Sequence, residues 1–159
     1  MANIPKEKIV YADETGIDKY LYRQYGRAKK GEKVIAKVSG RKFKRVGIVA
    51  AQIRKKIIEP LQYNGTMNSS LFEAWFEKRL LPALPEECTI TLDNASFHSK
   101  KRLLLLAEKY GHNLVFLPPY SPELNDIEPF WACLKKRLRK VLPDYSSFDD
   151  AISDCFQVC

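Results

Sequence analysis

The sequence predicts one α/β domain, spanning residues 1–159, in which helices cover a mixed β-sheet. Two patterns predict this fold class. Several strand-like runs come first, and helical and extended segments then alternate along the rest of the chain. The composition also fits, because 45% of the 159 residues are apolar, enough for one buried core. No repeat, low-complexity segment or flexible linker divides the chain.

Strand-like runs occupy the first part of the chain. We expect strands at residues 8–12, 20–25, 45–52 and 57–63, the last closed by the turn-forming pair Asn64-Gly65. The first run leads into Asp-Glu-Thr-Gly at 13–16, where Asp13 also reads as a turn former at a strand end. If the strand continues, Asp13 and Glu14 point to opposite faces and cannot both face one site.

A helix is expected to follow, beginning at Asn68-Ser69-Ser70 and ending at Pro82 and Pro85. Large apolar side chains recur along it at helical spacing and predict a buried stripe. These residues are Leu71, Phe72, Trp75, Phe76 and Leu80.

The stretch from Cys88 to Trp131 holds the strongest signals. Residues 89–92 read as a buried strand, and Asp93 follows at its carboxyl end, where open α/β sheets place their ligands. A helix over 101–110 and a strand over 114–117 come next, before a rigid crossing that contains Pro118, Pro119 and Pro122.

Two more helices complete the predicted fold. The first has Asp126 as a plausible N-cap, Glu128 in its first turn and Pro129 tolerated there. The second begins at Ser146-Ser147 and carries an apolar stripe. The stripe residues are Phe148, Ala151, Ile152, Cys155 and Phe156.

Charge and composition narrow the classes of function. The net charge of +8 and the pI near 9.3 suit a polyanionic partner such as DNA or RNA. Four cysteines without a Cys-x-x-Cys pair and only two histidines argue against a zinc site and favour reduced thiols. No apolar segment resembles a signal peptide or a membrane span, so we expect a cytoplasmic protein with no membrane partner.

Three acids at element ends are the candidate metal ligands: Asp13, Asp93 and Glu128. Each acid also has a structural alternative. Asp13 could form a turn, Asp93 could begin an Asx turn with Asn94, and Glu128 could complement the positive end of the helix dipole. Together, in a basic chain without a histidine-cysteine cluster, they favour a carboxylate site for Mg²⁺ or Mn²⁺. Glu14 and Asp126 are the rival acids.

Two clusters of cations are candidate DNA contacts. Arg27, Lys29 and Lys30 lie in a glycine-flanked loop at 26–33. Lys135 and Arg139 share a helix face with Glu128, so a phosphodiester held at that acid would continue along them. The alternative interpretation is a solvated basic face.

Three segments together resemble the catalytic domain of DDE transposases, in the bacterial insertion-sequence branch related to mariner elements. They are Tyr-Ala-Asp-Glu-Thr-Gly at 11–16, Leu-Asp-Asn-Ala-Ser-Phe-His at 92–98 and Leu-Pro-Pro-Tyr-Ser-Pro-Glu-Leu-Asn-Asp-Ile-Glu-Pro-Phe-Trp at 117–131. The 34 residues between Asp93 and Glu128 also fit that superfamily. The resemblance covers nearly the whole chain.

The resemblance implies a ribonuclease H-like fold with a mixed five-stranded sheet flanked by helices. It implies that Asp13, Asp93 and Glu128 bind two Mg²⁺ ions, for which Mn²⁺ can substitute. The reaction would cut DNA at transposon ends and join the freed ends to target DNA, without a covalent protein intermediate.

Further residues take supporting positions in these motifs. Asn94, His98 and Asn125 would position water, phosphate or the acids, although His98 equally fits a hydrogen-bonded structural residue. Pro118, Pro119 and Trp131 read as scaffold that fixes Glu128.

The same resemblance bears on partners. Related transposases carry an N-terminal helix-turn-helix region and act as dimers on two DNA ends. Here the first acid comes at position 13, so we expect the catalytic half alone, with a homodimer in the active complex. End recognition would then come from an upstream helix-turn-helix protein or a frameshift-fused domain, and the protein would be bacterial and nucleoid-associated when bound to DNA. The alternatives are another ribonuclease H-like nuclease and a non-catalytic DNA-binding remnant of a transposase.

Overall fold

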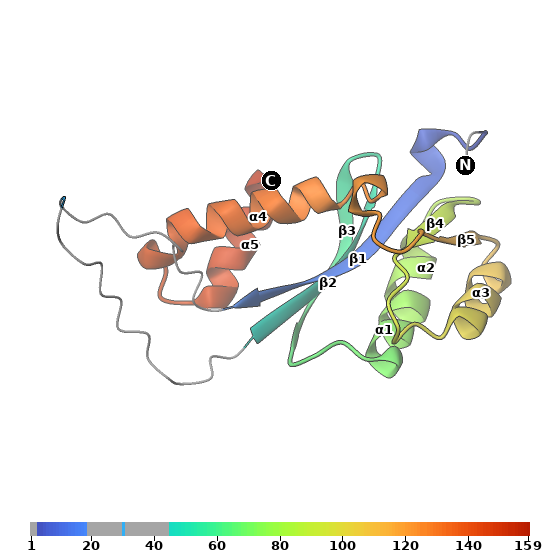
Figure 1. Ribbon diagram of the computed structural model, residues 1–159, viewed down its shortest axis with the longest axis horizontal. Coiled ribbons are helices and arrows are strands. Elements are labelled where there is room, and N and C mark those ends of the chain that lie inside the picture. The colour runs from blue at the N-terminus through green and yellow to red at the C-terminus, as the bar shows by residue number, and fades with distance from the viewer. Residues whose placement is uncertain (1–2, 19–29, 31–44) are drawn as a thin grey trace.

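A mixed five-stranded sheet organises the described residues, 3–18, 30 and 45–159, of the computed structural model (Figure 1). The strand order is β3-β2-β1-β4-β5, with β1 antiparallel to β2 and parallel to β4. The elements in chain order are η1 (Lys6–Lys8), β1 (Ile9–Asp18), β2 (Arg45–Ile53), β3 (Lys56–Asn64), α1 (Ser69–Trp75), η2 (Phe76–Leu80), α2 (Leu81–Ala83), β4 (Thr89–Leu92), α3 (Lys100–Lys109), β5 (Asn113–Phe116), η3 (Pro122–Leu124), α4 (Glu128–Val141), η4 (Leu142–Asp144) and α5 (Phe148–Val158). The predicted fold class is confirmed.

Each face of the sheet is covered by its own helices and has its own hydrophobic core. On one face α1, η2, α2 and α3 pack through residues such as Phe72, Trp75 and Leu103. On the other face α4 and α5 pack through Trp131, Leu134 and other apolar side chains (Figure 1). Because successive residues of β1 point to opposite faces, β1 supplies both cores.

Strand β1 is longer than the run predicted at 8–12. It stays paired with β2 from Val10 opposite Ile53 to Asp18 opposite Arg45. The interpretation of Asp13 as a turn former at a strand end is therefore wrong, because ladder pairing carries the chain through the Asp-Glu-Thr-Gly segment.

Most other sequence predictions about the sheet are confirmed within a residue or two. Gly65 lies in the turn predicted after β3 and has a φ of +84°. Glycine adopts this left-handed conformation without the steric cost that a side chain would add. The strand predicted at 20–25 and most of the loop at 26–33 lie outside the described residues.

The helix predictions need two corrections. Pro82 does not end the first helix, because the chain continues through the π-helical η2 into α2, where Pro82 occupies the first turn that needs no N–H donor. Asp126 does not cap α4. Ile127 takes that place, and the Asp126 carboxylate instead contacts the Lys55 ammonium at 3.4 Å.

The predicted starts of two other helices are confirmed, and the structure shows a side-chain cap at each. The side chain of Asn68 accepts a hydrogen bond from the Leu71 N–H, and that of Ser147 accepts one from the Asp150 N–H. Among the helices of the described ranges, none has the length and apolar character needed to cross a bilayer.

Candidate active site

Three carboxylates from three different elements line one open pocket of about 380 Å³. Asp13 comes from the middle of β1, Asp93 directly follows β4, and Glu128 is the first residue of α4. The sheet brings the first two together, because β1 and β4 run parallel and pair as far as Tyr11 opposite Thr91. Continued two residues further, that register sets Asp13 beside Asp93.

A proline-rich wall completes this acid pocket. The chain from β5 to α4 crosses the carboxyl edge of the sheet and folds over the acids before entering the helix. The remaining pocket residues are Asn94, Ala95, Leu117, Pro118, Pro119, Tyr120, Ser121, Pro122 and Asn125. Because proline fixes φ, this wall holds Glu128 with little freedom to move.

Asp13 is buried and held by three hydrogen bonds. Its Oδ1 accepts the Glu14 N–H at 2.9 Å. Its Oδ2 accepts hydrogen bonds from the Asn125 side-chain amide and the Trp131 indole N–H, each at 3.2 Å. Asn125 and Trp131 are themselves buried, so the carboxylate is fixed from the α4 side of the sheet.

The pKa of Asp13 reflects its burial and the negative charges beside it. Burial raises the pKa of Asp13 to about 7, and the negative charges of Asp93 and Glu128 add to this rise. Hydrogen bonds from Glu14 and Trp131 act in the opposite direction but do not cancel it. Three acids that repel one another in one pocket form a site that a cation would stabilise.

Asp93 is positioned by His98. Its Oδ1 lies 3.1 Å from His98 Nε2 and accepts the Ala95 N–H at 3.3 Å. The hydrogen bond with His98 is the main cause that lowers the pKa of Asp93. The His98 ring is buried against Phe72 and Phe97, with centroids 4.4 Å away in both cases.

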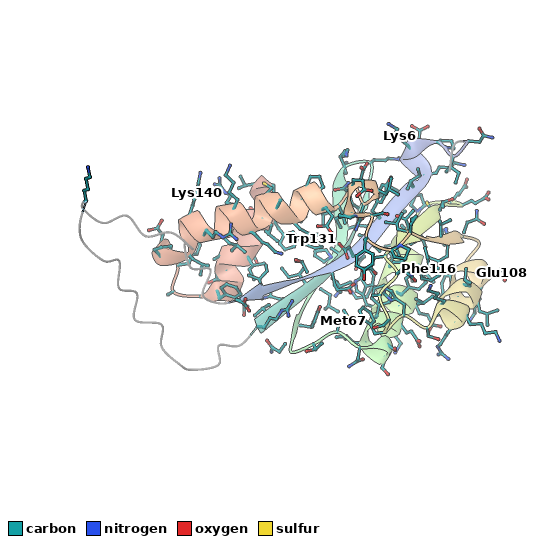
Figure 2. The ribbon with its side chains drawn as sticks, in the orientation of Figure 1. Lys6, Met67, Glu108, Phe116, Trp131 and Lys140 are labelled. Carbon is teal, nitrogen blue, oxygen red and sulfur yellow. The ribbon has the colours of Figure 1, made fainter. Side chains whose placement is uncertain are left out.

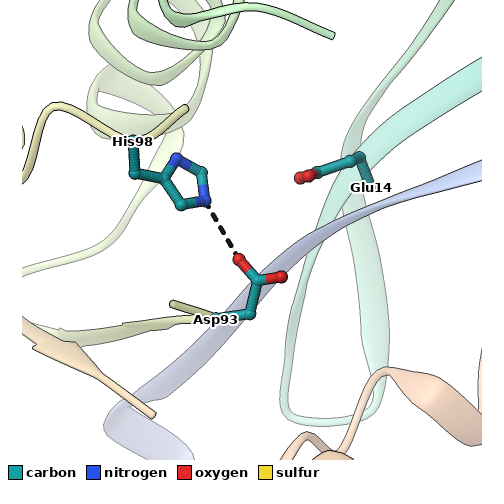
Figure 3. A group of neighbouring side chains, drawn as sticks. All are labelled: Glu14, Asp93 and His98. Atoms are coloured by element: carbon teal, nitrogen blue, oxygen red, sulfur yellow. Dashed lines mark hydrogen bonds and ion pairs between the residues drawn. The ribbon is translucent and has the colours of Figure 1, made fainter. Parts of the chain in front are cut away.

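Glu14 approaches the same aspartate from the other face of the sheet. One oxygen or nitrogen from each of Glu14, Asp93 and His98 lies within 4.8 Å of the others (Figure 3). Glu14 Oε2 is buried and has no hydrogen-bond partner among the described residues. Burial, with the charges of Asp13 and Asp93, raises the pKa of Glu14 to about 8.

Strand alternation correctly predicted that Asp13 and Glu14 face opposite sides. Asp93 nevertheless lies close to both, because it follows the last residue of β4 and is not enclosed within the sheet. Two overlapping ligand sets therefore share Asp93. One combines it with Asp13 and Glu128, and the other with Glu14 and His98.

The donor chemistry of the acid pocket suits a hard divalent cation. Carboxylate and amide oxygens are the preferred ligands of Mg²⁺ and Mn²⁺, and the pocket wall supplies both kinds. Asn125 Oδ1 is buried without a hydrogen-bond partner in the described part of the chain, so a polar acceptor is also free there. The residues present fit such an ion.

The structure brings together most predicted site residues and adds one. Asn94 lines the acid pocket, while His98 and Asn125 contact acids directly. Trp131 was interpreted only as scaffold for Glu128, yet its indole binds Asp13. No sequence spacing reports this contact, because 118 residues separate the two partners.

The predicted DNA contacts lie outside the acid pocket. Lys135 and Arg139 are on α4, half-buried and exposed, respectively, beyond Glu128 along the helix. Lys30 is exposed, and Arg27 and Lys29 fall outside the described residues.

The metal-free protein is expected to lose stability as the pH rises from about 5 to about 8. The ordinary pKa values are 3.8 for Asp13 and 4.5 for Glu14, and the folded values are about 7 and about 8. A raised folded pKa contributes stability that is present below the ordinary pKa and lost as the pH passes the folded value. The loss should reach a few kcal/mol, as an order of magnitude.

Chemical denaturation at pH 5 and pH 8 measures this loss. Asp13→Asn should flatten the profile, and Mn²⁺ added at pH 8 should restore stability. A parent protein equally stable at both pH values would show that these acids are not crowded.

The fold has known relatives among solved structures. The Mos1 transposase paired-end complex with the left transposon end gives a TM-score of 0.67 at 16% identity, over 96% of this chain and 52% of that chain. The Mos1 mariner paired-end complex with Mn gives 0.61 at 16% identity, over 98% and 53%. The catalytic core domain of BIV integrase gives 0.52 at 14% identity, over 94% and 81%.

These similarities establish a ribonuclease H-like fold, and the chain spans about half the length of the Mos1 chains it matches. A comparison with curated proteins gave no match. The sequence profile of the DDE superfamily endonuclease family matches residues 8–150, which include all three acids of the pocket. Because this match covers most of the chain, the protein belongs to the DDE superfamily endonuclease family.

Proposed function

We propose that this chain is the catalytic domain of a DNA transposase. It would hydrolyse phosphodiester bonds at transposon ends and transfer the freed strand to target DNA. The observation that carries this proposal is the meeting of Asp13, Asp93 and Glu128 in one open pocket of a DDE endonuclease fold. The net charge of +8 supports a DNA substrate.

Asp13, Asp93 and Glu128 would hold two Mg²⁺ ions, for which Mn²⁺ can substitute. A solved Mos1 complex contains Mn, which supports the choice of ion. When bound, such a pair of ions supplies activation of the attacking hydroxyl and stabilisation of the leaving oxygen.

The protein's own residues would keep this site rigid. Trp131 and Asn125 hold the carboxylate of Asp13, and His98 holds that of Asp93. Fixed ligands need no reorganisation during the reaction, which is the main advantage of a preorganised site. Lys135 and Arg139 would contact phosphates further along the DNA, as an electrostatic and sequence-independent contribution.

The proposal extends to partners. We expect a homodimer to bring two DNA ends together, and a helix-turn-helix region to recognise the terminal repeats. The Mos1 paired-end complex, which shares the fold, supports the pairing of two DNA ends.

A plasmid assay tests the proposal without knowledge of the terminal repeats. Supercoiled DNA is incubated with protein and Mn²⁺, with and without a chelator, beside a labelled oligonucleotide that has a free 3′-hydroxyl. Metal-dependent nicking together with joining of the oligonucleotide is expected. Nicking without joining would favour another nuclease, and DNA binding without nicking would favour a non-catalytic remnant.

A further inference from the structure

Two cationic residues, Arg54 and Lys55, occupy turn positions whose positive φ angles usually favour Asn and Gly. Arg54 and Lys55 form the two-residue loop between Ile53 and Lys56, with φ values of +51° and +63°. Two consecutive positive φ values define a type I′ turn, for which Asn-Gly is the preferred pair. A backbone conformation unfavourable to the residues that adopt it points to a use for their side chains.

These side chains line a second pocket, of about 720 Å³. Lys6, Arg54 and Lys55 supply its positive charges, and Glu7 and Asp126 supply its negative charges. Arg54 Nε donates a hydrogen bond to the Glu7 backbone carbonyl. Because a carbonyl carries no net charge, this hydrogen bond does not neutralise the guanidinium.

The ion pairing in this pocket is weak. Lys55 pairs with Asp126 at 3.4 Å, but both side chains are more than half exposed, so water screens the pair. Lys8 and Lys56 are also exposed, next in sequence to Glu7 and Lys55. The surroundings of the turn are therefore positive overall.

The second pocket lies beside the acid pocket on one face of β1. Ile9 and Tyr11 line it, and strand alternation puts them on the same face as Asp13. Asp126 lines the second pocket and Asn125 lines the acid pocket, so a single loop separates the two. Gln52 Nε2 donates to the Asp126 carbonyl at 3.1 Å and fixes this loop.

The spacing suits a DNA strand. Val10 pairs with Ile53 at the base of the β2–β3 turn. Asp13 lies three residues further along β1, so the base of the turn and Asp13 are about 10 Å apart along the strand. A duplex rises about 3.4 Å per nucleotide, so about three or four nucleotides cover that length. Figure 1 shows the β2–β3 turn close to the start of α4, and Figure 2 shows Lys6 on the adjoining N-terminal segment.

We propose that Arg54, Lys55 and Lys6 form a phosphate-binding surface that holds the DNA backbone about three or four nucleotides from the three carboxylates. This inference rests on the proposed function, because it takes DNA as the substrate. Phosphate contacts of this kind position the duplex without reading its sequence.

The turn offers a test in which binding and stability move in opposite directions. Arg54→Asn combined with Lys55→Gly installs the preferred type I′ pair and removes two charges. We expect a higher melting temperature and about tenfold weaker binding of a fluorescein-labelled random-sequence duplex, measured by anisotropy without divalent metal. The slope of log affinity against log salt should fall by about one to two, since each lost phosphate contact removes about 0.9.

A matched control removes two charges elsewhere. The double variant Lys101→Gln with Lys109→Gln changes exposed positions of α3, which packs on the same face of the sheet as Phe72 and Trp75. It should leave the slope of log affinity against log salt unchanged. Lys6→Gln lies outside the turn and should lower the slope by about one even if the double turn variant folds poorly. Equal losses in the turn and α3 variants, or unchanged binding in both the turn and Lys6 variants, would overturn the proposal.

The same assays separate this inference from the proposed function. If the parent binds and nicks DNA but the turn and Lys6 variants bind equally well, only the phosphate-binding surface is wrong. If the parent neither binds nor nicks DNA, the proposed function fails and the surface loses its ligand.

Discussion

Replacing Asp93 with Asn is expected to lower metal-dependent nicking by at least about 10³-fold while the protein stays folded. Asp93 belongs to both ligand sets, so no other carboxylate can take its place. Metal ions typically supply several kcal/mol of transition-state stabilisation, and each 1.36 kcal/mol is a factor of ten in rate. Nicking rates with Mn²⁺ measure the loss.

Two measurements show whether the loss arises at the site. The Asp93 side chain is 45% exposed, so the Asn variant should unfold close to the parent's melting temperature. The control Asp144→Asn, at an exposed position of η4, should nick like the parent. An Asp93→Asn protein that nicks normally would remove Asp93 from the site and contradict the proposed chemistry.

Replacing Trp131 with Phe is expected to lower nicking about 10- to 100-fold, the usual effect of losing a residue that orients a metal ligand. The change keeps a buried aromatic ring but removes the N–H that binds Asp13 Oδ2. Asp13 would keep its bonds to Asn125 and Glu14 but could rotate more freely. The variant should also bind Mn²⁺ more weakly, which a purely structural role would not cause.

Trp75→Phe is the matched control for this change. Trp75 is equally buried, and its indole donates to the Glu59 carbonyl at 2.8 Å, away from the acids. Both variants should lose similar stability, and only Trp131→Phe should lose activity and metal affinity. If the two variants lost nicking activity in proportion to their loss of stability, Trp131 would not be positioning Asp13.

Local signals in the sequence predicted much of the fold. Strand β4 and the helix starts at Asn68 and Ser147 depend on residues close in sequence, and all three predictions are confirmed. The extent of β1 was missed because Asp-Glu-Thr-Gly resembles a turn. Its extended form depends on pairing with β2, a distant segment.

The candidate site divides in the same way. The end of β4 and the start of α4 were predicted correctly as the positions of Asp93 and Glu128, whereas Asp13, predicted at a strand end, lies in the middle of β1. The structure nevertheless places all three acids in one pocket. The hydrogen bonds from Asn125 and Trp131 to Asp13 join residues more than a hundred positions apart, so no local pattern reveals them. The approach of Glu14 to Asp93 depends on β4 ending at Leu92, which leaves Asp93 close to both faces.

In the proposed site, Asp13, Asp93 and Glu128 bind the metal ion and Glu14 lies outside it. The most direct test is calorimetric titration of Mn²⁺ into the protein with duplex DNA present, comparing the parent with Glu128→Gln and Glu14→Gln. We expect Glu128→Gln to lose Mn²⁺ binding and Glu14→Gln to keep it. Binding that persists in Glu128→Gln and disappears in Glu14→Gln would instead assign the ion to Glu14, Asp93 and His98.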